Sequence, residues 1–312
     1  MQRILVYLIL LVKTVIFFMI SLLYSQQSFQ GMAVYESKTS TTNMSQGWMN
    51  NREITPEMRA RIEERMKAAF EKTYILNFDR NASTYAEEEK MEVTSNNQGG
   101  GFRMMSSFTG GGGTTYKNLK DKMFMVDKEF FGREFLVKDS LPAYQWEMTG
   151  ETKQIGAYMC YKATAKRPTS ISDFRNMRRR AEDSKEGDKK KEESAEAKKE
   201  EKKEEKTTNF MDGWEMPKEV IVTAWYTMDI PVSHGPENYW GLPGLILEVN
   251  DGTTTILCSK IVLNPKEKKE IKAPKNGKVV TQAEFDKIMK EKMEEMREMG
   301  GRPGQRTFRM GG

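Results

Sequence analysis

The sequence predicts an α+β fold, in which a mainly antiparallel, curved, half-barrel-like sheet packs against one or two helices. Three observations support this prediction. Short apolar segments alternate with polar residues at the period of β-strands. Turn residues flank these segments. The regular alternation of strand and helix patterns that would indicate a parallel sheet is absent. Two segments have the three- and four-residue spacing of an amphipathic helix.

The predicted strands are short and rich in β-branched and aromatic residues. Asn250, Asp251 and Gly252 stand between two apolar runs and predict a hairpin turn. Links this short indicate antiparallel pairing of neighbouring strands. The predicted strands are residues 31–38, 74–78, 83–85, 122–126, 134–137, 144–148, 158–164, 220–226, 245–249 and 253–261.

Two helices are predicted. The first opens at Thr55, with Pro56 at the favoured first position, and the second opens with a capping box between Thr281 and Glu284 and ends at Gly300. We expect the second helix to lie in the concave face of the sheet. The apolar faces are Met58, Ile62, Met66 and Ala69 in the first helix, and Phe285, Ile288, Met289, Met293, Met296 and Met299 in the second.

The amino terminus predicts export. Arg3 precedes an almost entirely apolar stretch, and a small residue, Ser25, stands where a signal peptidase would cleave, so residues 1–25 are interpreted as a signal peptide. The alternative is an uncleaved anchor helix, in which Lys13 would carry a charge near the bilayer centre. We therefore expect a protein of the periplasm or the outer-membrane surface.

Residues 26–299 are predicted to form a single β-rich domain. Three stretches are not expected to contribute to its core: a glycine-rich loop at 96–115, an insertion at 167–209, and a flexible tail at 300–312. Much of the insertion consists of Glu and Lys without aromatic or β-branched residues, which predicts disorder because such a segment buries too little apolar surface to offset the entropy of ordering it.

The composition excludes several classes of site. The chain has one His and two Cys, so a zinc site built from Cys and His alone is not available, and its net charge of +5 is mild. A hydrolase centre that uses histidine would depend on His234. No cofactor is expected, and nucleic acid is not an expected partner. A basic cluster between Lys166 and Arg180 could contact anionic lipid head groups, without the chain spanning the membrane.

Residues 224–249 include the approach Trp225-Tyr226-Thr227 and the hexapeptide Gly241-Leu242-Pro243-Gly244-Leu245-Ile246. Together with residues 151–164, this run resembles the signature of the GLPGLI family, which consists of secreted envelope proteins of Bacteroidetes without an established activity. The charged insertion and the many methionines depart from that family. The resemblance implies a non-catalytic exported envelope protein, a binding or assembly partner of an outer-membrane transport system of the TonB-dependent type.

Two interpretations of this signature loop stay open. Its prolines and glycines fit a rigid corner whose aromatic residues pack at the end of the sheet. It also fits a recognition loop, because ordered loops on rigid scaffolds often carry binding. The candidate binding residues are Trp225, Tyr226, His234, Tyr239, Trp240, Gly241, Leu242, Pro243 and Gly244.

Two further features bear on chemistry. Cys160 and Cys258 form an even pair in a chain expected to be exported, which predicts a disulfide if their strands are neighbours, the alternative being two buried thiols. Met104, Met105 and Met310 lie in predicted loops, where burial does not explain them, and thioethers are ligands of Cu(I). A periplasmic Cu(I) carrier is thus one alternative function, and a hydrolase that uses His234 is another.

Overall fold

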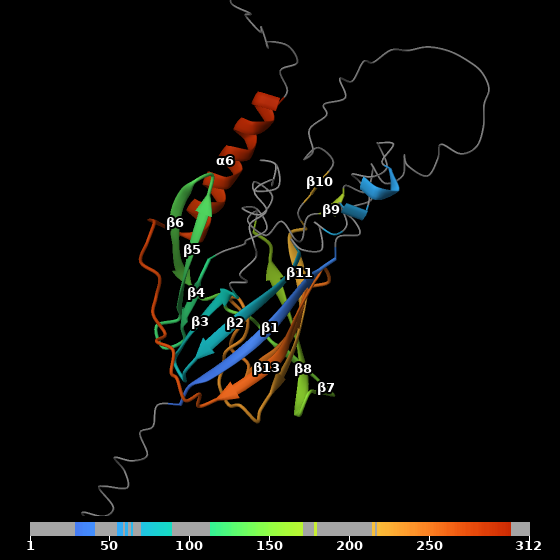
Figure 1. Ribbon diagram of the computed structural model, residues 1–312, viewed down its shortest axis with the longest axis vertical. Helices are drawn as coiled ribbons and strands as arrows, with labels where there is room; N and C mark the ends of the chain where they lie inside the picture. Colours follow the sequence, from blue (N-terminus) through green and yellow to red (C-terminus); the bar gives the residue numbers. More distant parts are fainter. Residues whose placement is uncertain are drawn as a thin grey trace, which may run out of the picture.

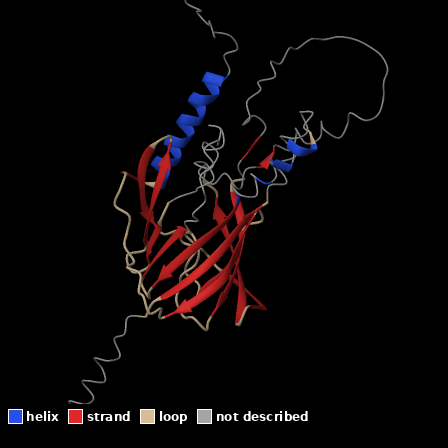
Figure 2. Cartoon of the chain, viewed as in Figure 1, coloured by secondary structure: helices blue, strands red, loops and turns tan. Residues whose placement is uncertain are grey.

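The computed structural model describes residues 29–40, 55–58, 60–61, 64, 70–88, 113–170, 178–179, 214–215 and 217–300, without the side chains of 178–179, 214–215 and 296–300. Most of the described chain is β-strand (Figures 1 and 2). Within these residues, no helix is long and apolar enough to cross a bilayer. The predicted signal peptide lies outside the described residues, as do nearly all of the glycine-rich loop and most of the charged insertion.

Twelve strands form one mixed sheet in the order β14-β6-β5-β4-β3-β2-β1-β13-β12-β11-β8-β7, and β9 pairs with β10 separately. All pairs are antiparallel except β14 with β6. The strands are β1 (Gly31–Thr39), β2 (Glu71–Phe78), β3 (Ala82–Glu87), β4 (Thr115–Asn118), β5 (Met123–Phe130), β6 (Arg133–Ser140), β7 (Glu147–Ile155), β8 (Tyr158–Pro168), β9 (Arg178–Arg179), β10 (Trp214–Glu215), β11 (Glu219–Thr227), β12 (Leu245–Asn250), β13 (Thr254–Leu263) and β14 (Lys278–Val280).

The predicted hairpin connects β12 to β13. Gly252 adopts a φ of 86°, and its backbone N–H donates to Oδ1 of Asn250 at 2.8 Å. Oδ1 of Asp251 accepts from the backbone N–H groups of Thr253 and Thr254 at 3.0 and 2.7 Å. These side-chain acceptors and the left-handed glycine confirm the turn that the sequence predicted.

The expected half-barrel is wrong. The sheet is broad and open, with β14 at one edge and β7 at the other. Neither edge is suited to closure, because β14 has three residues, and β7 has a register shift between Met148 and Thr152 and mostly exposed side chains.

Helix α6 (Gln282–Gly300) begins with the predicted capping box: the backbone N–H of Thr281 donates to Oε2 of Glu284 at 2.8 Å, and that of Glu284 donates to Oγ1 of Thr281 at 3.2 Å. The helix does not lie in a concave face. Phe285 and Met289 pack against the apolar ends of β5 and β6, and the remainder of the helix extends past them (Figure 1). The aromatic cluster at this end of the sheet gives the helix its apolar contact.

The first predicted helix is described in part. Residues 56–58, 60–61, 64 and 70 are helical, and the backbone N–H of Met58 donates to Oγ1 of Thr55 at 3.3 Å, as at a helix start. The predicted apolar face is wrong at Met58, which is 55% exposed. Ile62, Met66 and Ala69 lie outside the described residues.

Three clusters of buried side chains fill the fold. The first packs on one face of β1, β2, β12 and β13, the second on β8, β11 and β12, and the third joins β5, β6 and α6. Leu245 and Leu247 of β12 belong to the first cluster and Ile246 to the second, because successive side chains of a strand point to opposite faces. The connection from β11 to β12, which carries the signature loop, therefore sits between two cores.

Candidate functional site

Residues 228–244 connect β11 to β12 and contain the signature loop. His234 and Trp240 form an isolated antiparallel bridge. The backbone N–H of Ile246 donates to the carbonyl of His234 at 3.0 Å, and that of Leu245 donates to the carbonyl of Ile230 at 2.9 Å. The loop thus folds back on the start of β12 by main-chain hydrogen bonds, which gives it the geometry of a packed corner.

Two glycines of this loop are required by close contacts. A Cβ on Gly244 would lie 1.9 Å from the backbone oxygen of Thr227, which β11 holds in place. A Cβ on Gly235 would lie 2.8 Å from the Ile246 side chain and 3.1 Å from the backbone oxygen of Tyr239. Any other side chain would push the loop off the strand, so glycine is needed at both positions.

Two tryptophans fasten the loop to the segment before β7. Trp146 donates its indole N–H to the backbone carbonyl of Trp240 at 2.9 Å. Trp240 in turn donates its indole N–H to the backbone carbonyl of Pro142 at 2.7 Å. Because both indoles are partly buried and satisfied, they hold residues 142–146 in an irregular course where the sequence predicted a strand.

A fully buried lysine lies beneath the loop. Lys117, on β4, donates from Nζ to the backbone carbonyls of Gly235 and Tyr239, the second at 3.1 Å. Burial lowers the pKa of Lys117 from its usual 10.5 to about 7, an effect that the negative charge of Glu237 opposes. Neither of its partners is a carboxylate, so the ammonium group depends on carbonyl dipoles.

His234 does not have the environment of a catalytic base. Its side chain is 0% exposed, and its ring lies 6.1 Å from that of Phe78. Burial and the charge of Lys117 lower the pKa of His234 to about 3, an effect that a hydrogen bond with the backbone of Asp79 opposes. In this arrangement the imidazole is neutral and closed off from substrate, which argues against the hydrolase alternative.

A cleft of about 700 Å³ opens beside this loop, between the β2–β6 part of the sheet, the end of β8 and α6. We call it the tyrosine cleft, because tyrosines from separate parts of the chain line it. The Tyr74 and Tyr85 rings stack with centroids 4.8 Å apart, and those of Tyr144 and Tyr239 lie 5.5 Å apart. The apolar part of its wall comprises Phe124, Val126, Phe130, Phe285 and Met289.

Charged groups of both signs also line the tyrosine cleft. Two of its carboxylates accept hydrogen bonds from groups of the protein itself. Asp286 accepts from the hydroxyl of Ser170 at 2.7 Å and from the side-chain amide of Gln282 at 2.8 Å. Asp139 accepts from the backbone N–H of Gln282 at 3.1 Å. These bonds fix the start of α6 at the rim of the cleft, so hydrogen bonds hold the polar side chains of the rim in place.

The structure divides the candidate binding residues. Tyr239 lines the tyrosine cleft, whereas Leu242 and Gly244 are buried in the corner. Trp225 lies beneath the ammonium of Lys153, 4.3 Å from ring centre to Nζ, and the hydroxyl of Tyr226 donates to Sδ of Met148 at 2.9 Å. His234, Trp240, Gly241 and Pro243 belong to the corner and are not among the cleft-lining residues.

Sequence reasoning missed most of the tyrosine cleft. Tyr74, Tyr85 and Tyr144 lie in predicted strands for which the sequence indicates no role. Glu237 and Asn238 lie within the signature but are not among its candidate binding residues. Alternation showed that the first two tyrosines lie on strands, but their stacking depends on the register that sets Leu76 opposite Tyr85. That register is set by the turn between the two strands, in which Oδ1 of Asp79 accepts from the backbone N–H groups of Asn81 and Ala82 at 2.7 Å each. The Asp79 and Asn81 side chains are the signal in the sequence that could have indicated it.

Cys160 and Cys258 are free and buried in the structure. They lie on β8 and β13, which β11 and β12 separate in the sheet, so the condition set for a disulfide, that the two strands are neighbours, is not met. Both belong to the same core cluster. Burial raises the pKa of Cys160 to about 11 and that of Cys258 to about 12, which keeps both as unreactive thiols at neutral pH.

The structure does not test the hypothesis of Cu(I) binding by loop methionines, because Met104, Met105 and Met310 lie outside the described residues. Within the described ranges, His, Cys, Asp and Glu side chains form no group of three or more that could hold a metal ion.

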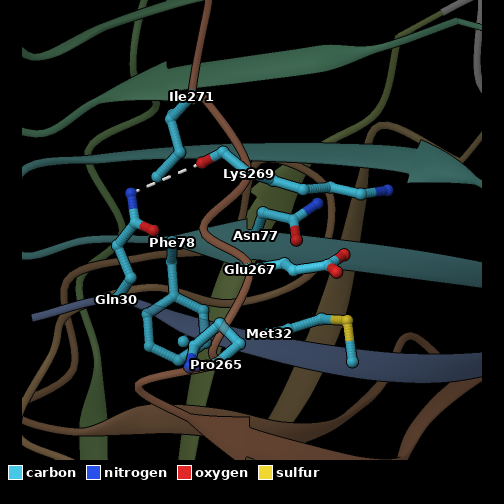
Figure 3. A pocket seen from close by; sticks show the side chains of 9 residues that line it. Gln30, Met32, Asn77, Phe78, Pro265, Glu267, Lys269 and Ile271 are labelled. Atoms are coloured by element: carbon cyan, nitrogen blue, oxygen red, sulfur yellow. Dashed lines mark hydrogen bonds between the residues drawn. The ribbon is translucent and has the colours of Figure 1, made fainter.

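A second, smaller cavity of about 210 Å³ lies at the other end of β1 and β2 (Figure 3). The segment that follows β13 covers it, and the side-chain amide of Gln30 donates to the backbone carbonyl of Lys269 at 3.4 Å. Phe78 and Met32 supply much of its apolar wall, while the side chains of Glu267 and Lys269 point to the same side (Figure 3). Its size suits a packing gap beneath a crossing segment rather than a ligand site.

Residues 146–248 match the model of a Bacteroidetes family described as "Protein of unknown function (Porph_ging)". The match runs from the start of β7 to β12 and contains the whole signature loop. Among curated proteins, none matches the chain.

Two solved structures of PNGF-II, determined in space groups C2 and P21, resemble the chain. The identities are 12% and 11%, and the TM-scores are 0.41 and 0.40. In each case 84% of this chain is covered, and the chain spans about a third of the solved structure, 32% and 33% respectively.

Proposed function

We propose that this protein is an exported, non-catalytic envelope protein of the GLPGLI type that binds a protein partner through the tyrosine cleft. The hexapeptide at residues 241–246 supports the family, and the apolar leader at residues 1–25 supports export to the periplasm or the outer-membrane surface. The partner implied by the family resemblance is an outer-membrane transporter of the TonB-dependent type.

The observation that carries the binding role is the tyrosine cleft itself. Four tyrosines line a concave surface beside a corner held by two tryptophan hydrogen bonds. Tyrosine combines a large apolar face with a polar tip and has few rotatable bonds, so ordering it on binding costs little entropy. Concave surfaces that combine aromatic walls with a few supported polar groups are typical of ligand and partner sites.

The chemistry of the cleft favours binding over catalysis. Asp139 and Asp286 accept hydrogen bonds from protein donors at the start of α6, so their charge is used to hold the rim. His234, the sole histidine, is buried beneath the corner. Its ring therefore stands apart from the surface that a partner would meet.

Site-specific photo-crosslinking in the native envelope tests the proposal. Tyr144→p-benzoylphenylalanine places the reactive group in the tyrosine cleft, and Met159→p-benzoylphenylalanine is the control, because Met159 is exposed and lines neither cavity. We expect an outer-membrane transporter to be captured from position 144 and not from position 159.

The controls separate binding from proximity. A second variant combines the crosslinker at position 144 with Tyr74→Ala, and the yield should fall because a wall of the cleft is lost. Capture of the same proteins in equal yield from positions 144 and 159 would contradict a cleft-specific interaction, and capture of no transporter would contradict the proposed partner.

A further inference from the structure

Lys117 is the most unusual side chain beside the tyrosine cleft. It is 0% exposed on β4, although lysine is among the residues least often fully buried. An ammonium group without a carboxylate partner is costly to bury, so its position has to be explained by what it holds. Its two partners are the backbone carbonyls of Gly235 and Tyr239.

Those two carbonyls flank a turn of the signature loop. Within it, the backbone N–H of Tyr239 donates to the carbonyl of Pro236 at 3.1 Å, and Glu237 adopts a φ of 46°, in the left-handed region. Three residues of this turn line the tyrosine cleft: Glu237, Asn238 and Tyr239. One buried amino group thus holds both ends of the turn that forms one wall of the cleft.

We propose that Lys117 is a positioning residue for the tyrosine cleft: its amino group clamps the turn at residues 235–239 in the shape that binds the partner. This inference rests on the proposed function for its biological meaning. The clamp itself is a property of the fold and is testable without a partner.

The surroundings of Lys117 make its proton responsive near neutrality. Burial lowers its pKa to about 7. The titratable groups that face it come from the loop: Glu237, whose charge favours the ammonium form, and His234, whose own pKa of about 3 keeps it neutral near pH 7. The neighbouring strands present Ser83 of β3 and Phe124 of β5 opposite Lys117, and neither titrates in this range.

Protonation opposes burial of the clamp. Opening the turn exposes Lys117 to water, where its pKa returns towards the usual 10.5, so the open turn binds a proton that the closed turn releases above about pH 7. Opening therefore becomes less favourable as the pH rises through 7. The amides that the loop protects, those of Tyr239, Gly241 and Ile246, then exchange with solvent less readily.

Hydrogen exchange followed by mass spectrometry tests the clamp on the whole protein at about pH 6 and about pH 8.5, on either side of the pKa of about 7. After correction for the intrinsic effect of pH, we expect protection of a peptide spanning residues 235–246 to rise by about tenfold between the two pH values, because the buried amine is mostly neutral at the higher one. A peptide spanning β5 and β6 should keep its protection at both.

Lys117→Met removes the amino group and keeps a long apolar side chain, so protection of residues 235–246 should be low at both pH values. Lys162→Met is the matched control, because Lys162 lies on β8 and pairs with Glu151 at 2.8 Å, away from the loop. It should behave as the unmodified protein does. Protection that does not change with pH in the unmodified protein would overturn the clamp even if Lys117→Met failed to fold, and so would pH dependence that persists in Lys117→Met.

The crosslinker at position 144 links the clamp to binding. Its yield should rise between about pH 6 and about pH 8.5 in step with protection of the turn. A turn whose protection rises while the yield stays constant would overturn the positioning role and leave the proposed function intact. A cleft that captures no partner at either pH would overturn the proposed function itself, whatever the exchange data show.

Discussion

Trp146 donates its indole N–H to the backbone carbonyl of Trp240 at 2.9 Å, which joins the segment before β7 to the signature loop. The two residues are far apart in the sequence, and this bond ties the edge strand of the sheet to the corner between β11 and β12. The segment at 142–146 also contributes Tyr144 to the tyrosine cleft. The same bond therefore supports both the corner and the cleft.

Trp146→Phe should destabilise the fold by about 1–3 kcal/mol, because it removes the donor and leaves the carbonyl of Trp240 without this partner. Trp225→Phe is the control, since the face of that indole, rather than its N–H, makes the contact with Lys153. Urea unfolding followed by circular dichroism measures both. Equal losses in the two variants would show that the lost bond is not what matters at Trp146.

Gly244→Ala should cost more than about 3 kcal/mol or prevent folding, because the new Cβ would lie 1.9 Å from a backbone oxygen of β11. Gly150→Ala is the comparison variant: Gly150 has a φ of 77° and open space around its Cβ position, so its substitution introduces left-handed backbone strain without a close contact. That strain should cost about 1 kcal/mol. Thermal unfolding of the two variants should show the larger loss for Gly244→Ala, and a loss no larger than that of Gly150→Ala would refute the close approach.

Local patterns predicted the parts of the fold that local forces determine. Alternation placed the strands that became β1, β11 and β13, and Asn250-Asp251-Gly252 placed the hairpin, because each depends on residues close in sequence. The capping box at Thr281 and Glu284 was predicted for the same reason.

Distant contacts determine the features that the sequence did not predict. The segment at 115–118 is mostly polar and follows a run of glycines, yet it forms β4, because it pairs with β3 on one side and β5 on the other. Lys117 on this strand reaches a carbonyl of the signature loop. Residues 144–146 have the composition of a strand, but the bond from Trp146 to Trp240 holds them outside the sheet. The tyrosine cleft depends on these same contacts, which explains why the sequence identified its signature loop and missed its walls.

The sequence and the structure disagree on whether Cys160 and Cys258 form a disulfide, and chemical labelling decides between the two. The structure has both thiols free and buried, with raised pKa values, so an alkylating reagent should label neither in the native protein and both after unfolding without a reductant. Mass spectrometry of protein isolated from an oxidising compartment counts the labels. Absence of labelling after unfolding, with labelling restored by a reductant, would instead establish the disulfide between Cys160 and Cys258 that the sequence predicted.

His234 should make the protein sensitive to acid. The unfolded chain binds a proton on this imidazole below about pH 6.5, whereas burial keeps the folded form neutral until about pH 3. The unfolded state thus binds more protons in this window, and the free energy of unfolding falls as the pH falls from 6.5 towards 3. The contribution is on the order of several kcal/mol.

His234→Phe removes this proton and retains a planar, apolar ring in the buried site. Its free energy of unfolding at neutral pH should therefore change little, and its loss of stability in acid should be much smaller than that of the unmodified protein. Urea titrations at a series of pH values between about 7 and about 4 supply the two curves. Parallel curves would mean that the imidazole titrates in the folded protein as it does in water, and hence that the corner admits solvent.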